Sequence, residues 1–141
     1  MYTEEIKTKK VSDLMSRNIL VGHVTNSFTH TLRIFAEMTF HHLPIVNAKH
    51  EVIGMLSSND MLKSLSLKLP MLKQSDEETL NMVFDIRELM TPDPQVISSG
   101  ASISEALSIF SKYHIHALPV IDKNELVGII TSNDVLAALK K

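Results

Sequence analysis

Residues 54–60 read Gly-Met-Leu-Ser-Ser-Asn-Asp, and residues 128–134 read Gly-Ile-Ile-Thr-Ser-Asn-Asp. Two further pairs precede these stretches in the same order: Leu-Pro-Ile-Val at 43–46 with Leu-Pro-Val-Ile at 118–121, and Val-Ser-Asp-Leu-Met at 11–15 with Ile-Arg-Glu-Leu-Met at 86–90. The spacing between the copies is constant except for one residue deleted from the turn before residue 128. An ordered match of this length predicts an internal duplication.

Each copy predicts the same succession of elements. A short apolar stretch indicates a strand, after which Ser27 or Ser102 opens a helix. The helix ends before Pro44 or Pro119, since the residue before a proline is pushed towards extended geometry. Two more strands and a second helix complete the copy. The predicted strands are 19–21, 43–46 and 52–56 in the first copy and 95–97, 118–121 and 126–130 in the second. The predicted fold class is α/β (α+β), with two β-α-β-β-α repeats.

The segments outside the repeats complete the division of the chain. Ser75-Asp76-Glu77-Glu78 is typical of a helix start, with Ser75 and Glu78 as a capping box, and predicts a connecting helix over 76–83. The second helix of each repeat is expected to turn leucines inward, Leu62 with Leu65 and Leu136 with Leu139. We expect an N-terminal arm at 1–10, a first motif at 11–65, a connecting segment with a helix at 66–85, and a second motif at 86–141.

Composition excludes several classes of protein. The 141 residues carry 14 Lys and Arg against 16 Asp and Glu, with no basic stripe, so neither nucleic acid nor an anionic membrane is an expected partner. The absence of cysteine excludes disulfides and thiolate chemistry. The N-terminus is too polar for a signal peptide, and no apolar run approaches the roughly 20 residues that cross a bilayer. We therefore expect a cytoplasmic protein.

The duplicated motifs resemble a known family. Residues 86–136 are similar to a cystathionine-β-synthase (CBS) motif through Glu-Leu-Met-Thr at 88–91, His-Ala-Leu-Pro-Val at 116–120 and the stretch at 128–134; residues 11–62 form a more divergent copy. The resemblance implies a tandem CBS pair, or Bateman module, of the stand-alone prokaryotic type. Such pairs fold around a pseudo-twofold axis with two clefts between the sheets, commonly bind AMP, ADP, ATP or S-adenosylmethionine, and often form homodimers.

Two hydroxyl–carboxylate pairs are the candidate ligand-binding residues. Thr131 lies at the end of a predicted strand and Asp134 in the first turn of the helix that follows; Ser57 and Asp60 match them in the first repeat. A carboxylate accepts two hydrogen bonds, which suits the vicinal hydroxyls of a ribose, and free N–H groups at a helix start suit phosphate. In the family the matching residues contact ribose or phosphate. The other interpretation is that each pair only caps its helix.

The other expected ligand contacts follow from the resemblance. His41 and His116 occupy a position that faces the ligand's phosphates in related pairs, and Ile45 and Val120 would offer main-chain atoms to adenine. The basic residue that often follows the histidine is replaced by His42, a ligand-binding candidate that carries charge to the phosphates only when protonated, and by Ala117, whose side chain cannot contact them. The sequence also has Asn59 and Asn133 where relatives are often basic. These departures favour AMP, ADP or a sulfonium adenosine over ATP.

The sequence leaves three alternatives to a ligand sensor. His41-His42 and His114-x-His116 could suggest a metal-responsive switch, but no cysteine or carboxylate ligand accompanies them, so we expect no metal site. No catalytic motif is present, which predicts a regulatory module without enzymatic activity or a required cofactor. A ligand-free module for dimerisation or protein docking is the alternative function. The sensor would act on a separate effector protein.

Overall fold

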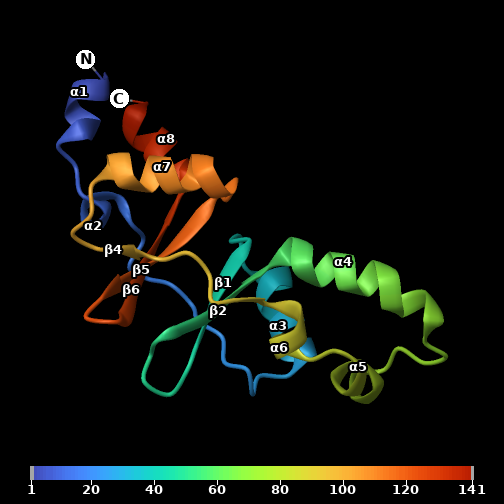
Figure 1. Cartoon of the computed structure of the whole chain (residues 1–141). Helices are drawn as coiled ribbons and strands as arrows, with labels where there is room; N and C mark the ends of the chain where they lie inside the picture. Colours follow the sequence, from blue (N-terminus) through green and yellow to red (C-terminus); the bar gives the residue numbers. More distant parts are fainter. Residues whose placement is uncertain (1, 141) are drawn as a thin grey trace. The chain divides into compact units, whose positions relative to one another are not determined.

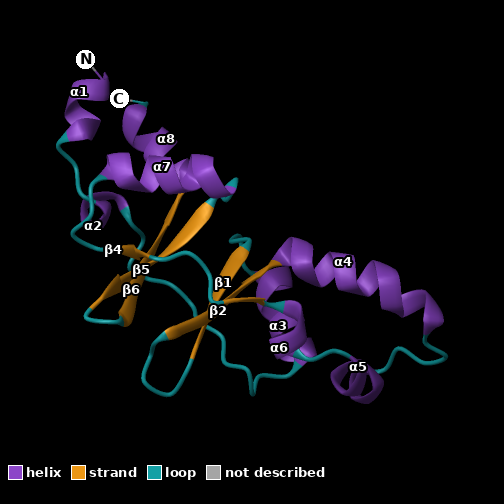
Figure 2. Cartoon of the chain, in the orientation of Figure 1, coloured by secondary structure: helices purple, strands orange, loops and turns teal. Residues whose placement is uncertain are grey.

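The computed structural model describes residues 2–140, and the side chains of residues 5–140. The chain divides into two compact units. Unit 1 combines the residues up to Ile19 with those from Gln95 onward, and unit 2 is the continuous segment Leu20–Pro94. Figure 1 shows the elements of each unit along the chain, and Figure 2 shows that both units combine helices with short strands.

Unit 2 is a three-stranded sheet with its helices. Its strands, in the order β1-β2-β3, are β1 (His42–Val46), β2 (Val52–Ser57) and β3 (Thr91–Pro92), and both pairings are antiparallel. Its helices are α3 (Phe28–Glu37), α4 (Ser58–Lys68), the 3-10 turn η1 (Leu69–Met71), α5 (Glu77–Val83) and α6 (Ile86–Leu89). Phe28 from α3 and Met61 from α4 are buried against the strand residues Leu43 and Leu56, so these helices cover the sheet.

Unit 1 repeats this plan with a different third strand. Its strands, in the order β4-β5-β6, are β4 (Ile97–Ser98), β5 (Ala117–Asp122) and β6 (Glu125–Thr131); β4 is parallel to β5, and β6 is antiparallel to it. Its helices are α1 (Tyr2–Lys7), α2 (Val11–Leu14), α7 (Ile103–Tyr113) and α8 (Ser132–Leu139). Ile103 from α7 and Val135 from α8 are buried with Leu118 and Ile130.

The two β-hairpins confirm the repeat at the level of structure. The four strands predicted at 43–46, 52–56, 118–121 and 126–130 are all present, as are the helices that flank them. The first predicted strands are less accurate. Residues 19–21 form no strand, and only Gly22 makes an isolated bridge to Ile45, while the strand predicted at 95–97 lies at 97–98. Strand β3 was not predicted.

Each unit contains the opening motif of one repeat together with the remainder of the other repeat. Residues 11–16 begin the first repeat, yet Val11 and Met15 are buried in the core of unit 1 with the second repeat. Ser16 exchanges two backbone hydrogen bonds with Ile129 of β6, at 2.8 and 3.0 Å. Residues 86–92 begin the second repeat, but Ile86 is buried in unit 2 and β3 pairs with β2. The compact units therefore do not coincide with the sequence repeats.

The glycine of each repeat makes this exchange of opening motifs possible. A Cβ placed on Gly128 would lie 2.7 Å from the backbone oxygen of Ser16, and one placed on Gly54 would overlap the side chain of Met90. In the structure Gly128 lies within β6, and the space beside it is filled by the chain itself.

The inward orientation predicted for two leucines is wrong. Leu62 on α4 is 61% exposed and Leu136 on α8 is 63% exposed. Their preceding neighbours, Met61 and Val135, are the buried residues. The error is one position on each helix, which rotates the apolar side by about 100°.

The connecting helix forms where it was predicted, with a different cap. The α5 helix spans 77–83, and its N-cap is Asp76, whose side chain accepts from the Thr79 N–H, instead of Ser75. Its bonds are to α3: Asn81 Oδ1 accepts from the Thr29 N–H at 2.9 Å, and Thr29 Oγ1 donates to Glu77 at 3.2 Å.

The cap of α5 should weaken in acid. Hydrogen bonds from Thr79 lower the pKa of the Asp76 carboxyl below its ordinary value. A depressed pKa means that the cap stabilises the helix at pH values above the unfolded-state pKa of about 3.9, and that this contribution is lost as the pH falls through the lower folded-state value. The protection of the Thr79 amide, expressed relative to its intrinsic exchange rate at each pH, should therefore fall below about pH 4. Asp76→Asn, which keeps a capping oxygen but does not titrate, should remove this dependence; an unchanged dependence would contradict the assignment.

Candidate functional site

In the first repeat, Ser57 and Asp60 form a reciprocal pair at the start of α4. The Ser57 Oγ accepts from the Asp60 N–H, and the Asp60 Oδ2 accepts from the Ser57 N–H, both at 3.0 Å. This is a capping box, in which two backbone donors that the helix leaves unpaired are satisfied by side chains. Both residues are half-buried.

The second repeat builds the same arrangement at the start of α8. The Thr131 Oγ1 accepts from the Asp134 N–H at 3.1 Å, and the Asp134 Oδ2 accepts from the Thr131 N–H at 2.8 Å. The structure thus places the predicted hydroxyl and carboxylate together in both repeats. The capping role that was weighed as an alternative to ligand binding is present in both.

The capping boxes do not engage every hydrogen-bonding group of the two pairs. Each aspartate employs only Oδ2 in its capping box, which leaves Oδ1 outside the box. The hydroxyls of Ser57 and Thr131 act there as acceptors, so each still has a proton to donate. The two interpretations are therefore compatible: one oxygen of the carboxylate holds the helix start, and the other remains for a ligand.

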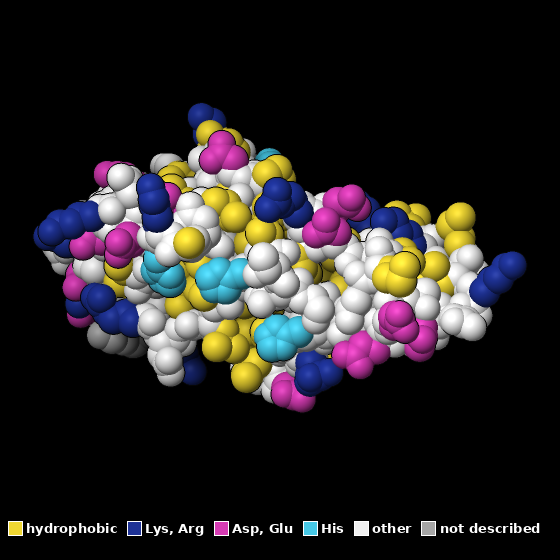
Figure 3. Space-filling view, turned by 90° about the horizontal axis from the view of Figure 1, so that it is seen from below, with side chains coloured by type: hydrophobic (Ala, Val, Ile, Leu, Met, Phe, Trp, Pro, Cys, Tyr) yellow, Lys and Arg dark blue, Asp and Glu magenta, His cyan; other side chains and the backbone are white. Residues whose placement is uncertain are grey.

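The histidines lie beside these pairs. The His41 carbonyl accepts from the Ser58 N–H, and the His116 carbonyl from the Ser132 N–H, both at 2.9 Å. His42 is the strand partner of Ser57 in the β1–β2 register, whereas Ala117 is the partner of Thr131 in β5–β6. The first repeat therefore has an additional imidazole beside its hydroxyl, a difference that depends on strand register. Figure 3 shows histidine side chains on the surface of the molecule.

Ile45 and Val120 are core residues of the two units. Both side chains are fully buried, Ile45 in the cluster of unit 2 and Val120 in that of unit 1. The Gly22 carbonyl accepts from the Val46 N–H, and the Gly22 N–H donates to the Pro44 carbonyl. The main-chain groups on either side of Ile45 are therefore already hydrogen-bonded within the protein. Val120 pairs with Ile97 of β4. Main-chain contact with adenine at these two residues stays a prediction.

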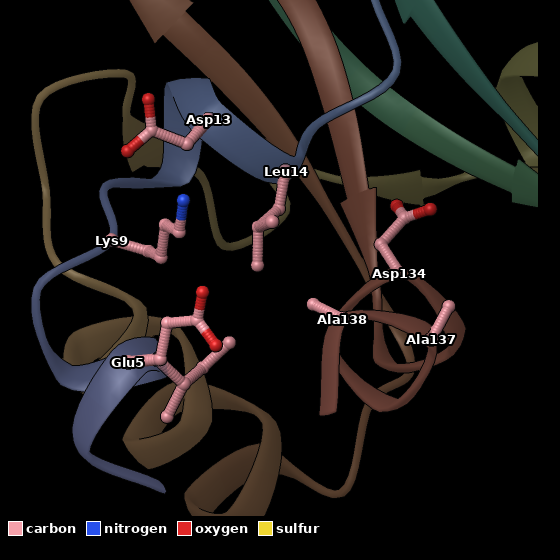
Figure 4. A pocket seen from close by; sticks show the side chains of 8 residues that line it. Glu5, Lys9, Asp13, Leu14, Asp134, Ala137 and Ala138 are labelled. Atoms are coloured by element: carbon pink, nitrogen blue, oxygen red, sulfur yellow. The ribbon is translucent and has the colours of Figure 1, made fainter. Parts of the chain in front are cut away.

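A pocket of about 440 Å³ opens beside Asp134. Its lining comes from α1, α2, α8 and the turn after α1: Glu5, Ile6, Lys9, Asp13, Leu14, Asp134, Ala137 and Ala138. Figure 4 shows Leu14 and Ala138 pointing into the pocket and Asp134 at its edge. Three carboxylates against one ammonium give the lining an excess of negative charge. The contribution of the N-terminal arm was not predicted, since residues 1–10 carry no motif.

The histidine clusters do not assemble further metal ligands. Among the described side chains, residues 5–140, no group of three or more His, Cys, Asp or Glu could hold a metal ion. His114 is the C-cap of α7, with a left-handed backbone (φ 54°), and β5 begins only at Ala117. Strand geometry would have placed His114 and His116 on one face, and that geometry is absent here.

The two hydroxyl–carboxylate motifs, the paired hairpins and the duplicated helices define a family. The chain belongs to the CBS domain family, whose model matches residues 11–67 and 86–141. Among solved structures it is similar to the CBS domain pair of protein MJ0100 in complex with 5′-methylthioadenosine and S-adenosyl-L-methionine. The TM-score is 0.75 with 25% identity, covering 92% of this chain and 94% of that one. It is also similar to AcuB from Vibrio cholerae, with a TM-score of 0.74 and 26% identity, covering 92% of this chain and 88% of that one.

Two of the curated relatives are much longer proteins. The chain is 27% identical over 132 residues to a homoserine O-acetyltransferase of Methanosarcina acetivorans, covering 93% of this chain and 22% of that protein. It is 30% identical over 126 residues to a homoserine O-acetyltransferase of Methanohalobium evestigatum, covering 89% of this chain and 23% of that protein. The chain thus spans about a fifth of these relatives. None of the helices described here has the length and hydropathy needed to cross a bilayer.

Proposed function

We propose that the chain is a regulatory module that binds an adenine nucleotide or another adenosyl ligand through the hydroxyl–carboxylate pairs of its repeats. The observation that carries the proposal is that Asp60 and Asp134 each use Oδ2 in the capping box, so that Oδ1 is not part of the helix cap. A ribose has two adjacent hydroxyl donors, and a carboxylate oxygen held at a fixed position accepts from them.

The second repeat favours a ligand with little negative charge. Ala117 offers no donor beside Thr131, and the pocket beside Asp134 has Glu5 and Asp13 against the single Lys9. Like charges close together raise the energy of a bound polyphosphate. We therefore place S-adenosylmethionine or 5′-methylthioadenosine ahead of ATP at this site, with AMP and ADP between them. The similarity to the MJ0100 pair, whose structure holds the first two compounds, supports this choice.

The module would act through its conformation. Ligand shifts the population between two shapes in proportion to its difference in affinity for them, and a separate effector protein responds to the shape. We propose that it does so as a cytoplasmic homodimer without catalytic activity or a required cofactor. The opening motif of each repeat belongs to the unit of the other, so a ligand at either pair acts on a unit that contains residues of both repeats.

Asp134→Asn should weaken adenosyl-ligand binding by about 10- to 100-fold. The amide keeps one oxygen to accept from the Thr131 N–H, but its NH₂ group replaces the second acceptor, and a hydrogen bond to a charged group contributes about 1.5–3 kcal/mol. Calorimetric titration with S-adenosylmethionine, 5′-methylthioadenosine, AMP, ADP and ATP measures the effect.

Asp60→Asn makes the matching change in the first repeat, and a loss of affinity in this variant would show that ligand binds there. Asp76→Asn is the control, because it makes the same change at a helix cap outside both pairs. Equal affinity in all three variants and the parent would contradict the proposed role of the carboxylates. No heat or thermal shift with any of the five compounds would leave the ligand-free association module in its place.

A further inference from the structure

The pocket beside Asp134 has a different character at each side. Figure 4 shows Asp134 at one side, and the opposite side carries three charged residues of the N-terminal segment: Glu5, Lys9 and Asp13. The surface between them is apolar and comes from α1, α2 and α8: Ile6, Leu14, Ala137 and Ala138. A volume of about 440 Å³ is within the range of small-molecule sites. The proposed function places a ribose at Asp134, so the charged side is available to a second group of the same ligand.

The α8 helix keeps the path between the two sides open. Asp134, Ala137 and Ala138 are spaced i, i+3 and i+4, so they lie along one face of the helix and span about 6 Å of its length. The methyl groups of the two alanines occupy little of the space above that face. A short, flexible chain attached to the ribose therefore has room to reach the charged side.

The N-terminal segment is held against unit 1 near each of its charged residues. Ile6 packs against the unit 1 core, and the Lys9 carbonyl accepts from the Ile103 N–H at 3.3 Å. Asp13 accepts through Oδ2 from the Lys10 N–H at 2.8 Å, which orients its carboxylate at the start of α2. These contacts fix the backbone from which the charged side chains extend.

The mixture of charges favours a ligand group that carries both signs. Among the described side chains, no cluster of carboxylates and imidazoles could hold a metal ion, so Glu5 and Asp13 do not form a metal site with Asp134. A phosphate would be repelled by the excess of carboxylates, and a purely cationic group would be repelled by the Lys9 ammonium. An α-amino acid group has an ammonium for the carboxylates and a carboxylate for the lysine. It is therefore complementary to both kinds of charge.

We propose that Glu5, Lys9 and Asp13 recognise the α-amino acid group of an adenosyl ligand whose ribose is bound at Asp134. Glu5 and Asp13 accept hydrogen bonds from its ammonium, and Lys9 donates to its carboxylate. S-adenosylmethionine is such a ligand: a sulfur and two methylene groups join its ribose to the amino acid, and they would lie over the apolar surface of α8. The proposal rests on the proposed function and assigns the residues that select among adenosyl ligands.

Two related compounds separate the parts of this recognition. 5′-Methylthioadenosine ends just beyond the sulfur and lacks the amino acid, whereas S-adenosylhomocysteine keeps the amino acid and lacks the positive charge of the sulfonium. The parent should bind S-adenosylmethionine about tenfold tighter than 5′-methylthioadenosine, with S-adenosylhomocysteine between them, since each exposed ion pair changes affinity by at most about fivefold. This preference should shrink as the salt concentration is raised, because exposed charges are screened.

Removal of the two carboxylates tests their role. Glu5→Gln with Asp13→Asn should weaken S-adenosylmethionine binding about three- to tenfold in calorimetric titration and leave 5′-methylthioadenosine binding unchanged. The new amide at position 13 keeps an oxygen for the Lys10 N–H, so α2 retains its cap. Glu105→Gln with Glu125→Gln is the control, because it removes the same charge from exposed positions of unit 1 outside the pocket lining. It should change neither affinity.

Lys9→Gln separates recognition of an amino acid from attraction of a simple cation. It removes the partner of the ligand's carboxylate and should weaken S-adenosylmethionine binding about two- to fivefold, although it makes the pocket more negative. If the pocket only attracted positive charge, the same substitution would strengthen binding. Ala138→Leu narrows the pocket without altering a charge, and it should weaken S-adenosylmethionine more than 5′-methylthioadenosine, whose substituent is shorter. Circular dichroism shows whether each variant is folded.

Several results would overturn the proposal. These are a parent that binds S-adenosylmethionine and 5′-methylthioadenosine equally, a double variant with unchanged affinity, or tighter binding after Lys9→Gln. Loss of S-adenosylmethionine binding in Asp60→Asn but not in Asp134→Asn would also contradict it, because the ligand would then lie in the first repeat. Each of these leaves the proposed function in place, since an adenosyl compound still binds. Failure of every adenosyl compound to bind would contradict both proposals.

Discussion

A fragment of residues 20–94 should fold alone, and a fragment of residues 11–67 should not. The second fragment contains a complete family motif, yet it lacks two core side chains of unit 2, Phe84 and Ile86. Phe84 stacks on Phe28 at a ring-centroid distance of 4.4 Å. Burying two such side chains stabilises by about 3–6 kcal/mol in total, which is most of the roughly 5 kcal/mol available to a small domain.

The fragment of residues 11–67 also lacks the partners of its N-terminal apolar side chains. Val11 and Met15 pack in unit 1, so in the short fragment they have no core to enter. Residues 20–94 contain every buried residue of the unit 2 cluster. Thermal melts by circular dichroism and dispersion of the amide spectrum distinguish the two. Phe84→Ala in the longer fragment is the control, and it should abolish the cooperative melt. A folded 11–67 beside an unfolded 20–94 would contradict the exchange of opening motifs.

Gly128→Ala should destabilise the protein by about 1–3 kcal/mol, and Gly54→Ala by clearly less. Both glycines are buried in a strand, so the two substitutions are matched. At Gly128 the new methyl would lie 2.7 Å from the backbone oxygen of Ser16, which is fixed by its bonds to Ile129. At Gly54 the nearest atoms all belong to the side chain of Met90, and a methionine can change rotamer.

Urea denaturation of the two variants measures this difference. Amide exchange at Ser16 and Ile129 provides a local measurement, since displacement of Ser16 breaks both bonds of that bridge. Protection at these two amides should fall in Gly128→Ala and stay unchanged in Gly54→Ala. Equal losses of stability in the two variants, or a larger loss for Gly54→Ala, would show that the Ser16 backbone yields as easily as the Met90 side chain.

The sequence predicted the parts of the fold whose signals are local. Prolines 44 and 119, the polar turns and the serine caps placed the hairpins and helices, because each acts through its own neighbours. The side on which Leu62 and Leu136 lie was missed, since adjacent apolar residues at 61–62 and 135–136 leave the orientation of the helix ambiguous. Residues 86–92 gave no indication that they join the first repeat, because that depends on contacts distant in the sequence.

The candidate site likewise has some features that follow from local sequence and others that depend on contacts distant in the sequence. The spacing Ser/Thr-x-x-Asp was enough to predict that hydroxyl and carboxylate meet, since a capping box needs only one helical turn. The contrast between His42 beside Ser57 and Ala117 beside Thr131 required strand register. The acidic lining from Glu5 and Asp13 required the packing of α1 and α2 on α8, which no pattern in residues 1–10 encodes.

The exchange of opening motifs between the units also sets the order in which the two units can fold during synthesis. All of unit 2 has left the ribosome once Pro94 is free, so it can form early and from contacts close in sequence. Unit 1 cannot form so early, because its N-terminal residues bond to residues that are synthesised much later. The Ser12 N–H donates to the Ser99 carbonyl, and Ser16 exchanges two backbone hydrogen bonds with Ile129. Closing so long a loop costs entropy, and until it closes Val11 and Met15 remain in water. Residues 11–16 are therefore synthesised before unit 2 but buried after it, and their apolar side chains are open to aggregation in the interval.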